Sequence, residues 1–463
     1  MSDNLGSAAN PLRVAIFGSG PSGFYAAEEL LKQEDPFVAV DMFDRLPVPF
    51  GLVRGGVAPD HPKIKTVTKL FERTADRARF RFFGNVAFGR DLSLDEVLDH
   101  YHQVLFCTGA ESDRRMGIPG EELAGSHPAT AFVAWYNGHP DYRHHEFDLS
   151  AETAVVVGIG NVAMDVARIL TRPVEELAQT DIAEHALEAL KVSKVRNVYL
   201  LGRRGPAQAA FTNPEIRELG EIQGTDLVLR ADEVELDDVS REYLEGQSGP
   251  ASRRNVEILQ EQAQKGQGTQ QRKIFLRFLA SPVELKGGSK VEAVVIEKNR
   301  LEKDSQGWIK ARGTGETEEV PAGLVFRSIG YLGTGLPGIP FDERSGIIPN
   351  DSGRVTGTDG TVQPRLYVAG WIKRGPSGVI GTNKPDSIAT VKVMVEDFQV
   401  RPQLLKAEHS RKDIGGILDK KGVRHFSFEE WRKIDEIEQK RGQAKGKPRE
   451  KFTSLADILK ALG

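Results

Sequence analysis

Cysteine is nearly absent from the chain, since Cys107 is the only one among 463 residues. One cysteine excludes an intramolecular disulfide, a redox-active cysteine pair and a cysteine-ligated zinc or iron–sulfur site within this chain. Any electron relay that the chain holds must therefore be organic. Because Cys107 ends a short apolar run, we expect it to be a small core residue.

Long apolar runs are also absent. No stretch of about 18 uninterrupted apolar residues occurs, so no segment predicts a helix that spans a bilayer. The opening residues MSDNLGSAANPLR lack the pattern of a secretion signal and the arginine-rich pattern of an organelle import signal. From these patterns we expect a cytoplasmic protein with no membrane partner.

Charge of one sign does not dominate the composition. The 62 basic and 66 acidic residues leave a formal net charge of −4, which provides no global field for nucleic acid. Nucleic acid is therefore not an expected partner. With 39% hydrophobic and 28% charged residues, the chain is long enough for two or three globular domains.

A glycine-rich turn with the spacing GxGxxG lies between a predicted strand at 13–18 and a predicted helix at 21–32. In a dinucleotide-binding fold the first glycine makes a tight turn, the second admits a pyrophosphate and the third lets the helix pack closely. The next apolar run, 37–43, is followed by an acid that can accept hydrogen bonds from both ribose hydroxyls. The predicted binding residues are Gly18, Gly20, Pro21, Ser22, Gly23 and Asp44.

A second turn of the same kind, GIGNVA, follows a predicted strand that begins at residue 153 and precedes a predicted helix at 162–170. Alanine replaces the third glycine, which helix packing tolerates. After the next strand, 198–201, two arginines stand where an acid would bind a free 2′-hydroxyl, and guanidinium groups attract a 2′-phosphate. The alternative is a solvated arginine pair at a strand end. The predicted binding residues are Gly158, Gly160, Asn161, Val162, Ala163, Arg203 and Arg204.

The two turns predict two different dinucleotides. A ribose paired with an acid suits FAD, and a ribose paired with two arginines suits NADP(H). Electron transfer between the two is the economical interpretation. The histidines that no motif uses, including His144 and His145, have no carboxylate or cysteine at ligand spacing, so no metal site is expected.

Apolar patterns organise the rest of the chain. Alternating stretches in 274–312 predict an antiparallel meander, and 246–273, rich in Gln, Gly and Arg, predicts a solvated excursion. The apolar runs 324–329 and 365–369 predict a return to the first domain. FEEWRKI and SLADILKALG, near the C-terminus, predict surface helices.

Five motifs follow one another along nearly the whole chain: GSGPSGF, PFGLVRGGVAPDHPKIK, GIGNVAMDVARIL, GRRGPAQAAFTNPEIREL and GWIKRGPSGVIGTNK. Together they resemble the bacterial form of the adrenodoxin reductase-like ferredoxin–NADP reductases. The resemblance implies an α/β fold with two Rossmann-like three-layer domains. It implies an NADP domain, 113–324, inserted into an FAD domain that comprises 1–112 and 325–463 with C-terminal helices.

The same resemblance implies an activity and a partner. Hydride would pass from NADPH to FAD, and single electrons would pass reversibly from FAD to a ferredoxin. Members work as monomers or as homodimers. Which ferredoxin is used, and in which direction electrons flow, stays open.

The resemblance also assigns roles to single residues. His61 and Glu218 would lie near the flavin and nicotinamide, where histidine can supply a proton or orient groups. Glu215 would contact the NADP ribose or the arginine pair, and Arg217 would face the ferredoxin, with Arg253 and Arg254 possible from charge alone. Lys373 and Arg374 would be either flavin partners or surface charges. The residues that would wrap the isoalloxazine and ribitol are Leu52, Val53, Arg54, Gly370, Trp371, Gly378, Val379 and Ile380.

Three other classes share part of this plan. A pyridine nucleotide-disulfide reductase needs a cysteine pair beside the flavin, and a glutamate synthase electron-input subunit needs cysteines for iron–sulfur clusters. Cys107 alone supplies neither. A non-enzymatic flavoprotein sensor has no supporting motif in the chain.

Overall fold

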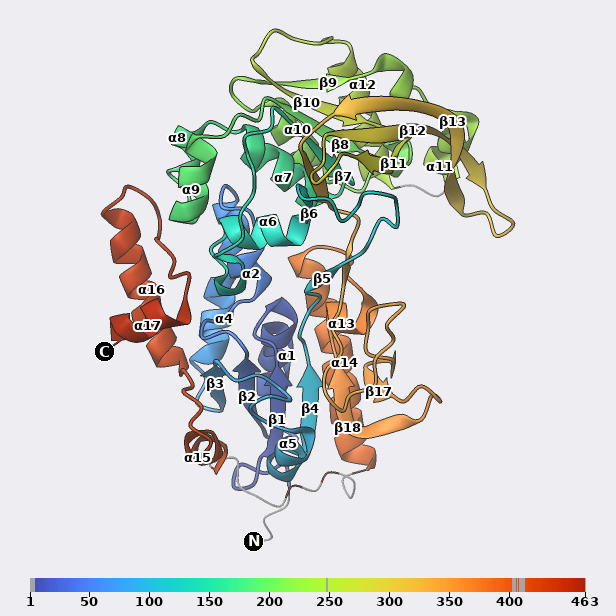
Figure 1. Ribbon diagram of the computed structural model, residues 1–463. Coiled ribbons are helices and arrows are strands. Elements are labelled where there is room, and N and C mark those ends of the chain that lie inside the picture. The colour runs from blue at the N-terminus through green and yellow to red at the C-terminus, as the bar shows by residue number, and fades with distance from the viewer. Residues whose placement is uncertain (1–4, 247–248, 402–404, 406, 408–412, 463) are drawn as a thin grey trace.

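The computed structural model describes residues 5–246, 249–401, 405, 407 and 413–462. Two halves lie one above the other in Figure 1, the lower built from both ends of the chain and the upper from its middle. Each half is organised around its own sheet. The predicted α/β fold with two Rossmann-like units is confirmed.

A seven-stranded sheet of order β16-β17-β18-β4-β1-β2-β3 forms the lower half. All its pairs are parallel except those of β16 with β17 and of β17 with β18. Strands from the two chain ends pair directly, so the middle of the chain is an insertion. The strands are β1 (Leu12–Phe17), β2 (Val38–Asp44), β3 (Phe80–Gly84), β4 (Gln103–Phe106), β16 (Asn350–Asp351), β17 (Arg354–Thr356) and β18 (Val362–Val368).

Both faces of this sheet are covered, as a buried parallel sheet requires. Along β1, Val14 and Ile16 pack into one apolar cluster, whereas Ala15 and Phe17 pack into another on the opposite face. The surrounding helices are α1 (Pro21–Lys32), α2 (Leu52–Gly55), α3 (Pro62–Lys65), α4 (Thr68–Ala75), α5 (Leu94–His100), α13 (Trp371–Arg374), α14 (Asn383–Val400) and α15 (Asp413–Lys420).

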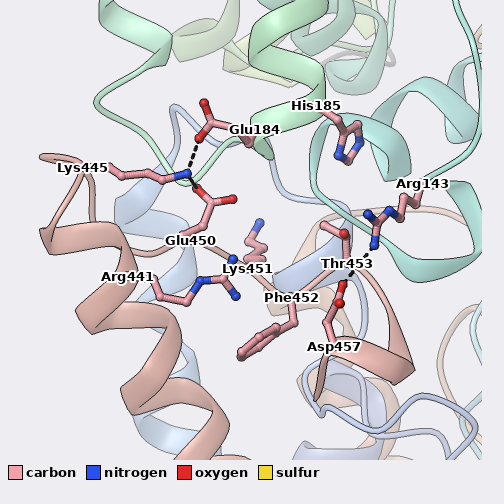
Figure 2. Close-up of a pocket in the computed structure, with 10 residues that line it drawn as sticks. All are labelled: Arg143, Glu184, His185, Arg441, Lys445, Glu450, Lys451, Phe452, Thr453 and Asp457. Carbon is pink, nitrogen blue, oxygen red and sulfur yellow. Dashed lines mark hydrogen bonds and ion pairs between the residues drawn. The ribbon is translucent and has the colours of Figure 1, made fainter. Parts of the chain in front are cut away.

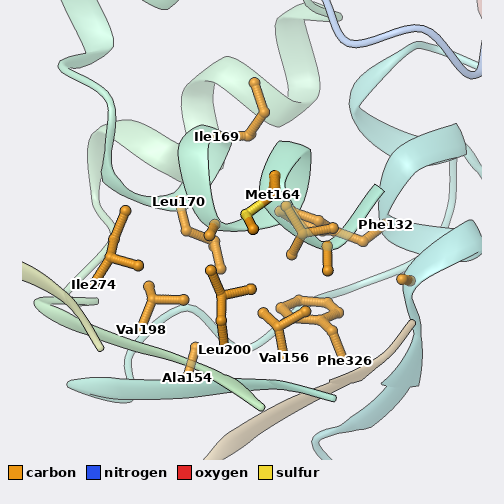
Figure 3. Packing of buried hydrophobic residues seen from close by; sticks show 14 of the residues in the cluster. Phe132, Ala154, Val156, Met164, Ile169, Leu170, Val198, Leu200, Ile274 and Phe326 are labelled. Carbon is orange, nitrogen blue, oxygen red and sulfur yellow. The ribbon is translucent and has the colours of Figure 1, made fainter. Parts of the chain in front are cut away.

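A six-stranded sheet of order β6-β14-β7-β8-β10-β9 forms the upper half, and all its pairs are parallel. Met164 and Ile169 pack near Val156 and Leu200 in its core (Figure 3). The strands and helices are β6 (Ser126–Pro128), β7 (Thr153–Val157), β8 (Asn197–Leu201), β9 (Thr225–Leu229), β10 (Arg272–Arg277), β14 (Leu324–Arg327), α6 (Ala129–Tyr136), α7 (Asn161–Thr171), α8 (Val174–Leu177), α9 (Glu184–Lys191), α10 (Asn213–Gly220), α11 (Asp238–Gly246) and α12 (Pro250–Ala263).

The other face of the upper sheet is covered by an antiparallel meander of β11 (Ala280–Lys286), β12 (Ala293–Lys303) and β13 (Ile309–Pro321). The predicted meander exists, but its predicted start is wrong, because β10 pairs in parallel with β8 and β9. A short apolar run has the same appearance in either kind of sheet.

Two further expectations about the middle of the chain are corrected. β14 pairs with β7 and β6, so the run at 324–329 belongs to the second sheet, and the chain returns to the first only afterwards. The return passes through β15 (Tyr331–Leu332), which pairs with β5 (Ser112–Asp113) between the halves. The predicted excursion at 246–273 contains α12, which buries Val256 and Leu259; residues 247–248 lie outside the described residues.

The C-terminal helices α16 (Phe428–Gln443) and α17 (Leu455–Leu462) run along one side of the lower half (Figure 1). They are predicted as surface helices, but Trp431 and Ile434 are buried in the core cluster of the first sheet. Both helices are amphipathic, so the spacing of their apolar residues predicts one apolar face on each. Whether that face is buried against the core depends on the rest of the fold. Residues 402–404, 406 and 408–412, before these helices, lie outside the described residues.

A buried group of charges joins the C-terminal segment to both halves. Lys451 Nζ donates to the Asn137 carbonyl oxygen at 3.1 Å and lies 3.2 Å from Asp181, both in the upper half. It also donates to the Arg54 carbonyl oxygen at 3.3 Å, in the lower half. Lys65 of α3 lies 2.6 Å from the same Asp181. Figure 2 shows Lys451 in the C-terminal segment that faces α9.

No helix in the described part of the chain is both long enough and apolar enough to cross a membrane.

Candidate active site

The first glycine turn lies where strand order reverses, between the carboxyl ends of β1 and β4. Gly18 has φ +106°, and a Cβ atom there would clash with the Cys107 carbonyl oxygen. Gly20, before α1, has open space on its Cβ side. Asp44, at the end of β2, accepts a hydrogen bond of 2.8 Å from the Ser19 amide, so its carboxylate is held beside the turn. These are the features of a dinucleotide site at a switch point.

Two distant segments converge on this turn. A Cβ atom at Gly51 would lie 3.0 Å from Gly20 Cα, and one at Gly370 would clash with Ser22 Oγ. The predicted flavin segments, 52–54 and 370–380, are therefore brought to the first turn by the fold. Leu52 and Val379 are 43% and 55% exposed, which leaves apolar side chains available there.

Trp371 and Arg54 have different surroundings within these segments. The Trp371 ring stacks on Tyr331 at a centroid distance of 5.7 Å, while its buried Nε1 has no hydrogen-bond partner among the described residues. Arg54 forms two hydrogen bonds to Glu438 of α16, at 2.8 and 2.5 Å. The Arg54 side chain therefore fixes α2 to the C-terminal helices.

Lys373 and Arg374 are partnered within the protein. Lys373 Nζ lies 2.9 Å from Asp386, and Arg374 donates to Asn383 at 2.9 Å and to the Ser377 carbonyl oxygen at 2.7 Å. Both side chains are less than a quarter exposed, so neither is a free surface charge. Their hydrogen bonds hold α13 against α14.

The second glycine turn repeats the geometry of the first between β7 and β14. Gly158 has φ +122°, and a Cβ atom there would clash with the Ser328 carbonyl oxygen. Gly160 has open space on its Cβ side, and α7 begins immediately after it. Asn161 Oδ1 accepts a hydrogen bond of 3.1 Å from the Thr212 amide, which ties this turn to the start of α10.

Arg203 and Arg204 follow β8, at the place that corresponds to Asp44 in the first half. Neither forms an ion pair within the described residues. Burial and the neighbouring charge of Arg203 lower the pKa of Arg204. Two guanidinium groups without a carboxylate partner are typical of a site for an anion.

His61, at the start of α3, lies between the halves. Its Nε2 is 2.8 Å from Glu218 of α10, and its Nδ1 is 3.5 Å from Arg168 Nη2. A guanidinium only donates hydrogen bonds and a carboxylate accepts them, so the two contacts suit the tautomer with its hydrogen on Nε2. The Glu218 side chain is 44% exposed and the His61 side chain only 12%, so Glu218 connects the ring with solvent.

Arg168 is fully buried beside His61. It lies 2.6 Å from Asp60 of the lower half, 2.5 Å from Asp165 and 3.1 Å from Glu215. Burial alone would raise the pKa of Asp60, but the hydrogen bond and charge of Arg168 lower it. Burial raises the pKa of Asp165 to about 6 although Arg168 opposes the shift.

Sequence reasoning missed Asp60, Asp165 and Arg168. The signal that could have identified the last two is a pair of opposite charges three residues apart in the apolar helix motif GIGNVAMDVARIL. Glu215 is expected from the sequence at the NADP ribose or the arginine pair, and the structure adds a hydrogen bond from Arg168 to its Oε2. The sequence of α10 alone does not show which arginine side chain the buried face of this helix contacts.

His61, Glu215 and Glu218 offer ligand atoms within 4.8 Å of one another, a spacing that a metal ion could use. Glu215 already accepts a hydrogen bond from Arg168, whose charge opposes a second cation. We therefore assign these three residues to the hydrogen-bond network of the site.

The three arginines considered for docking differ in their partners. Arg253 donates to the Leu244 carbonyl oxygen at 2.9 Å, and Arg254 lies 2.5 Å from Glu257. Arg217, on α10, is exposed and forms no ion pair with any residue that the structure describes. Arg254 is therefore paired with an acid, Arg253 is held by a main-chain oxygen, and Arg217 has neither contact among the described residues.

Comparison with known proteins identifies the family. The chain is 46% identical over 458 residues to NADPH-ferredoxin reductase FprA of Mycobacterium tuberculosis, covering 97% of this chain and 99% of that one. It is 42% identical to human mitochondrial NADPH:adrenodoxin oxidoreductase, covering 97% and 92%. No protein-family model matches the chain. The solved structure of M. tuberculosis FprA in complex with NADPH matches with a TM-score of 0.93 at 45% identity, covering 98% of this chain and 100% of that one. The two turns, the converging segments and these similarities have one explanation: the chain belongs to the adrenodoxin reductase-like family of NADPH-dependent ferredoxin reductases.

Proposed function

We propose that this protein takes hydride from NADPH onto a bound FAD and delivers single electrons to a ferredoxin. The observation that carries the proposal is the pair of equivalent turns with opposite charges at their ribose ends. Asp44 follows one turn, and Arg203 and Arg204 follow the other. A carboxylate repels a 2′-phosphate and guanidinium groups bind it, so the turns select different dinucleotides. The names of the relatives support a ferredoxin-type acceptor.

FAD suits the first turn. The open space at Gly20 gives a pyrophosphate access to the amides at the start of α1, and Asp44 accepts from the ribose. Trp371 Nε1 is a buried donor that an acceptor atom of the ring system would satisfy. When bound, FAD supplies a ring that takes two electrons as hydride and releases them singly. The residues proposed to hold it are Gly18, Gly20, Pro21, Ser22, Gly23, Asp44, Leu52, Val53, Arg54, Gly370, Trp371, Gly378, Val379 and Ile380.

NADPH suits the second turn for the same reasons. Gly160 leaves the amides at the start of α7 open to a pyrophosphate. The arginines come just after β8, and Asp44 ends β2 at the equivalent place in the first half, which supports their assignment to the 2′-phosphate. Asn161 orients the segment that leads into α10. The residues proposed to bind NADPH are Gly158, Gly160, Asn161, Val162, Ala163, Arg203, Arg204 and Glu215.

We propose a proton role for His61 and Glu218. His61 Nε2 holds a proton inside the site, and Glu218, half exposed, exchanges that proton with water. Arg168 fixes the ring orientation from the other side. The alternative role, orientation without proton exchange, is separated from this one by the pH experiment below.

We propose the domain bounds expected from the sequence, with one adjustment. Residues 1–112 and the segment after β14 would form the FAD domain, and 113–324 together with β14 would form the NADP domain. This division is supported by the sheets, since β1 to β4 pair with β16 to β18 in the first sheet, and β6 to β10 pair with β14 in the second.

Anaerobic stopped-flow absorption tests the activity. NADPH is expected to bleach the flavin spectrum of the purified protein faster than NADH does, and an oxidised ferredoxin is then expected to restore it rapidly. Bleaching without reoxidation by any ferredoxin would refute the acceptor. A colourless protein that takes up no FAD would refute the assignment of the first turn.

Replacing the arginine pair tests the NADPH assignment. The double substitution Arg203→Gln and Arg204→Gln is expected to raise the KM for NADPH by at least roughly 100-fold, because two charged hydrogen bonds of at least about 1.5 kcal/mol each are lost. The KM for NADH should change little, since NADH has no 2′-phosphate. Arg312→Gln, an exposed change on β13, is the matched control. Equal losses for both nucleotides would exclude a 2′-phosphate site.

The pH dependence of flavin reduction by NADPH tests His61. His61→Gln is expected to slow reduction by roughly 100-fold and to flatten the dependence of the rate on pH, because glutamine exchanges no proton. Glu218→Gln should flatten it partly, and His185→Gln, on α9, should leave it intact. A slower reaction with the wild-type profile would instead establish the orienting role.

Charge reversal of Arg217 tests the docking surface. Arg217→Glu is expected to raise the KM for ferredoxin by roughly tenfold and to weaken its dependence on salt, because acidic carriers associate through opposite charge. Flavin reduction by NADPH should be unchanged. Arg254→Glu provides the control. If Arg254→Glu has the same effect as Arg217→Glu, docking depends on net charge and not on this site.

A further inference from the structure

A pocket of about 290 Å³ lies beside the arginine pair. Its walls come from two segments that are far apart in the sequence. One follows β8 and contains Arg203 and Arg204, and the other is Trp308 with the first residues of β13, Ile309, Lys310 and Ala311. The sequence motifs identified the first wall only. The second wall comes from the meander, which no motif of the chain assigns to cofactor binding.

The meander is fixed to the arginine segment by buried hydrogen bonds. Asn299 of β12, only 4% exposed, donates from Nδ2 to the Arg203 carbonyl oxygen at 2.9 Å and to Ser281 Oγ at 2.8 Å. The Leu279 amide donates to the Arg204 carbonyl oxygen at 3.1 Å. The two walls of the pocket therefore belong to one rigid unit.

The turn that presents Trp308 is also ordered. Asp304 Oδ1 accepts hydrogen bonds from the amides of Gln306, at 3.0 Å, and Trp308, at 2.9 Å. The Trp308 carbonyl oxygen accepts from the Asp304 amide at 3.0 Å. The indole itself is 66% exposed, the highest exposure among the large aromatic side chains of the described chain. A ligand that stacks on this ring would bury apolar area that is now in water.

Charge in the pocket is predominantly positive. Arg203 and Arg204 have no acid partner among the described residues, and the nearest carboxylate to Lys310 Nζ is that of Asp304, at 3.7 Å. Asp304 Oδ1 accepts from the two amides of the turn and Oδ2 faces Lys310, so one carboxylate stands against three cations. Three cations beside one flat ring match a ligand that carries a phosphate next to an aromatic base.

We propose that Trp308 and Lys310 complete the site for the adenosine 2′-phosphate end of NADPH. Trp308 stacks on the adenine, and Lys310 adds a third cation to the two arginines around the 2′-phosphate. The inference rests on the proposed function and extends it, because it makes the meander part of the nucleotide site. Trp308 would recognise the adenine base, and Lys310 with the two arginines would recognise the phosphate.

Adenosine 2′-monophosphate and adenosine 5′-monophosphate, titrated into the flavin-loaded protein, separate the two contributions. Both share the adenine, and only the first carries a 2′-phosphate. Trp308→Ala is expected to weaken binding of both by roughly 5- to 100-fold, the range of an aromatic stacking contact. Lys310→Gln is expected to weaken only the 2′-monophosphate, by roughly 3- to 10-fold. Trp308→Phe should retain much of the affinity, and Lys298→Gln, exposed on β12, should change nothing.

Tryptophan fluorescence gives a direct readout. Of the other three tryptophans, Trp135 and Trp431 are 4% and 3% exposed, and the Trp371 ring is already stacked on Tyr331. An adenine that quenches fluorescence by stacking should therefore act on Trp308. Quenching by either nucleotide is expected in the wild-type protein and should be lost in Trp308→Phe. Because Trp308 is exposed, its replacement should leave the thermal unfolding midpoint unchanged.

Unchanged nucleotide affinities in Trp308→Ala and Lys310→Gln would overturn this inference. The proposed function would survive that outcome if NADPH still bleached the flavin and the arginine substitutions still removed the preference for NADPH. Failure of the wild-type protein to oxidise NADPH would instead overturn the proposed function, whatever the two variants bind.

Discussion

Buried cations that reach from one half of the molecule to the other hold the two nucleotide turns in a fixed relation. Arg168 extends from α7 of the upper half to Asp60 of the lower, and Lys65 extends from α3 of the lower half to Asp181 of the upper. A buried charge loses its hydration, and removing one partner of such a pair costs several kcal/mol. Any change in the orientation of the halves would separate these pairs, so they favour one orientation.

Hydride transfer makes this constraint relevant to function. The donor and acceptor atoms must come within about 3–3.5 Å, and a displacement of about 1 Å can cost two orders of magnitude in rate. The two turns belong to different sheets, so their distance depends on the contacts between halves. Lys451, which donates to main-chain oxygens in both halves, adds the C-terminal segment to those contacts. The helices predicted as a surface tail are in this way part of the structure that positions the cofactors.

The two halves have the same backbone geometry at their glycine turns but different side chains after the next strand. Gly18 and Gly158 both pass a neighbouring carbonyl group at a distance that no side chain allows, and both lie where strand order reverses. The difference in chemistry lies at the ends of the following strands, Asp44 in one and the arginine pair in the other. In the upper half, moreover, a meander takes the place of a helical layer, and its turn brings Trp308 beside the arginines.

The sequence by itself determined the two turns, the acid and the arginines at their ribose ends, and the absence of a cysteine relay, because each depends on neighbouring residues along one strand, turn and helix. Only the tertiary structure decided that β10 and β14 join the second sheet, that Glu215 pairs with Arg168, and that the C-terminal helices are buried against the core. These outcomes depend on contacts between residues far apart in the chain. An apolar strand, an amphipathic helix or a single carboxylate is compatible with several partners, and the partner is chosen by what the whole fold places beside it.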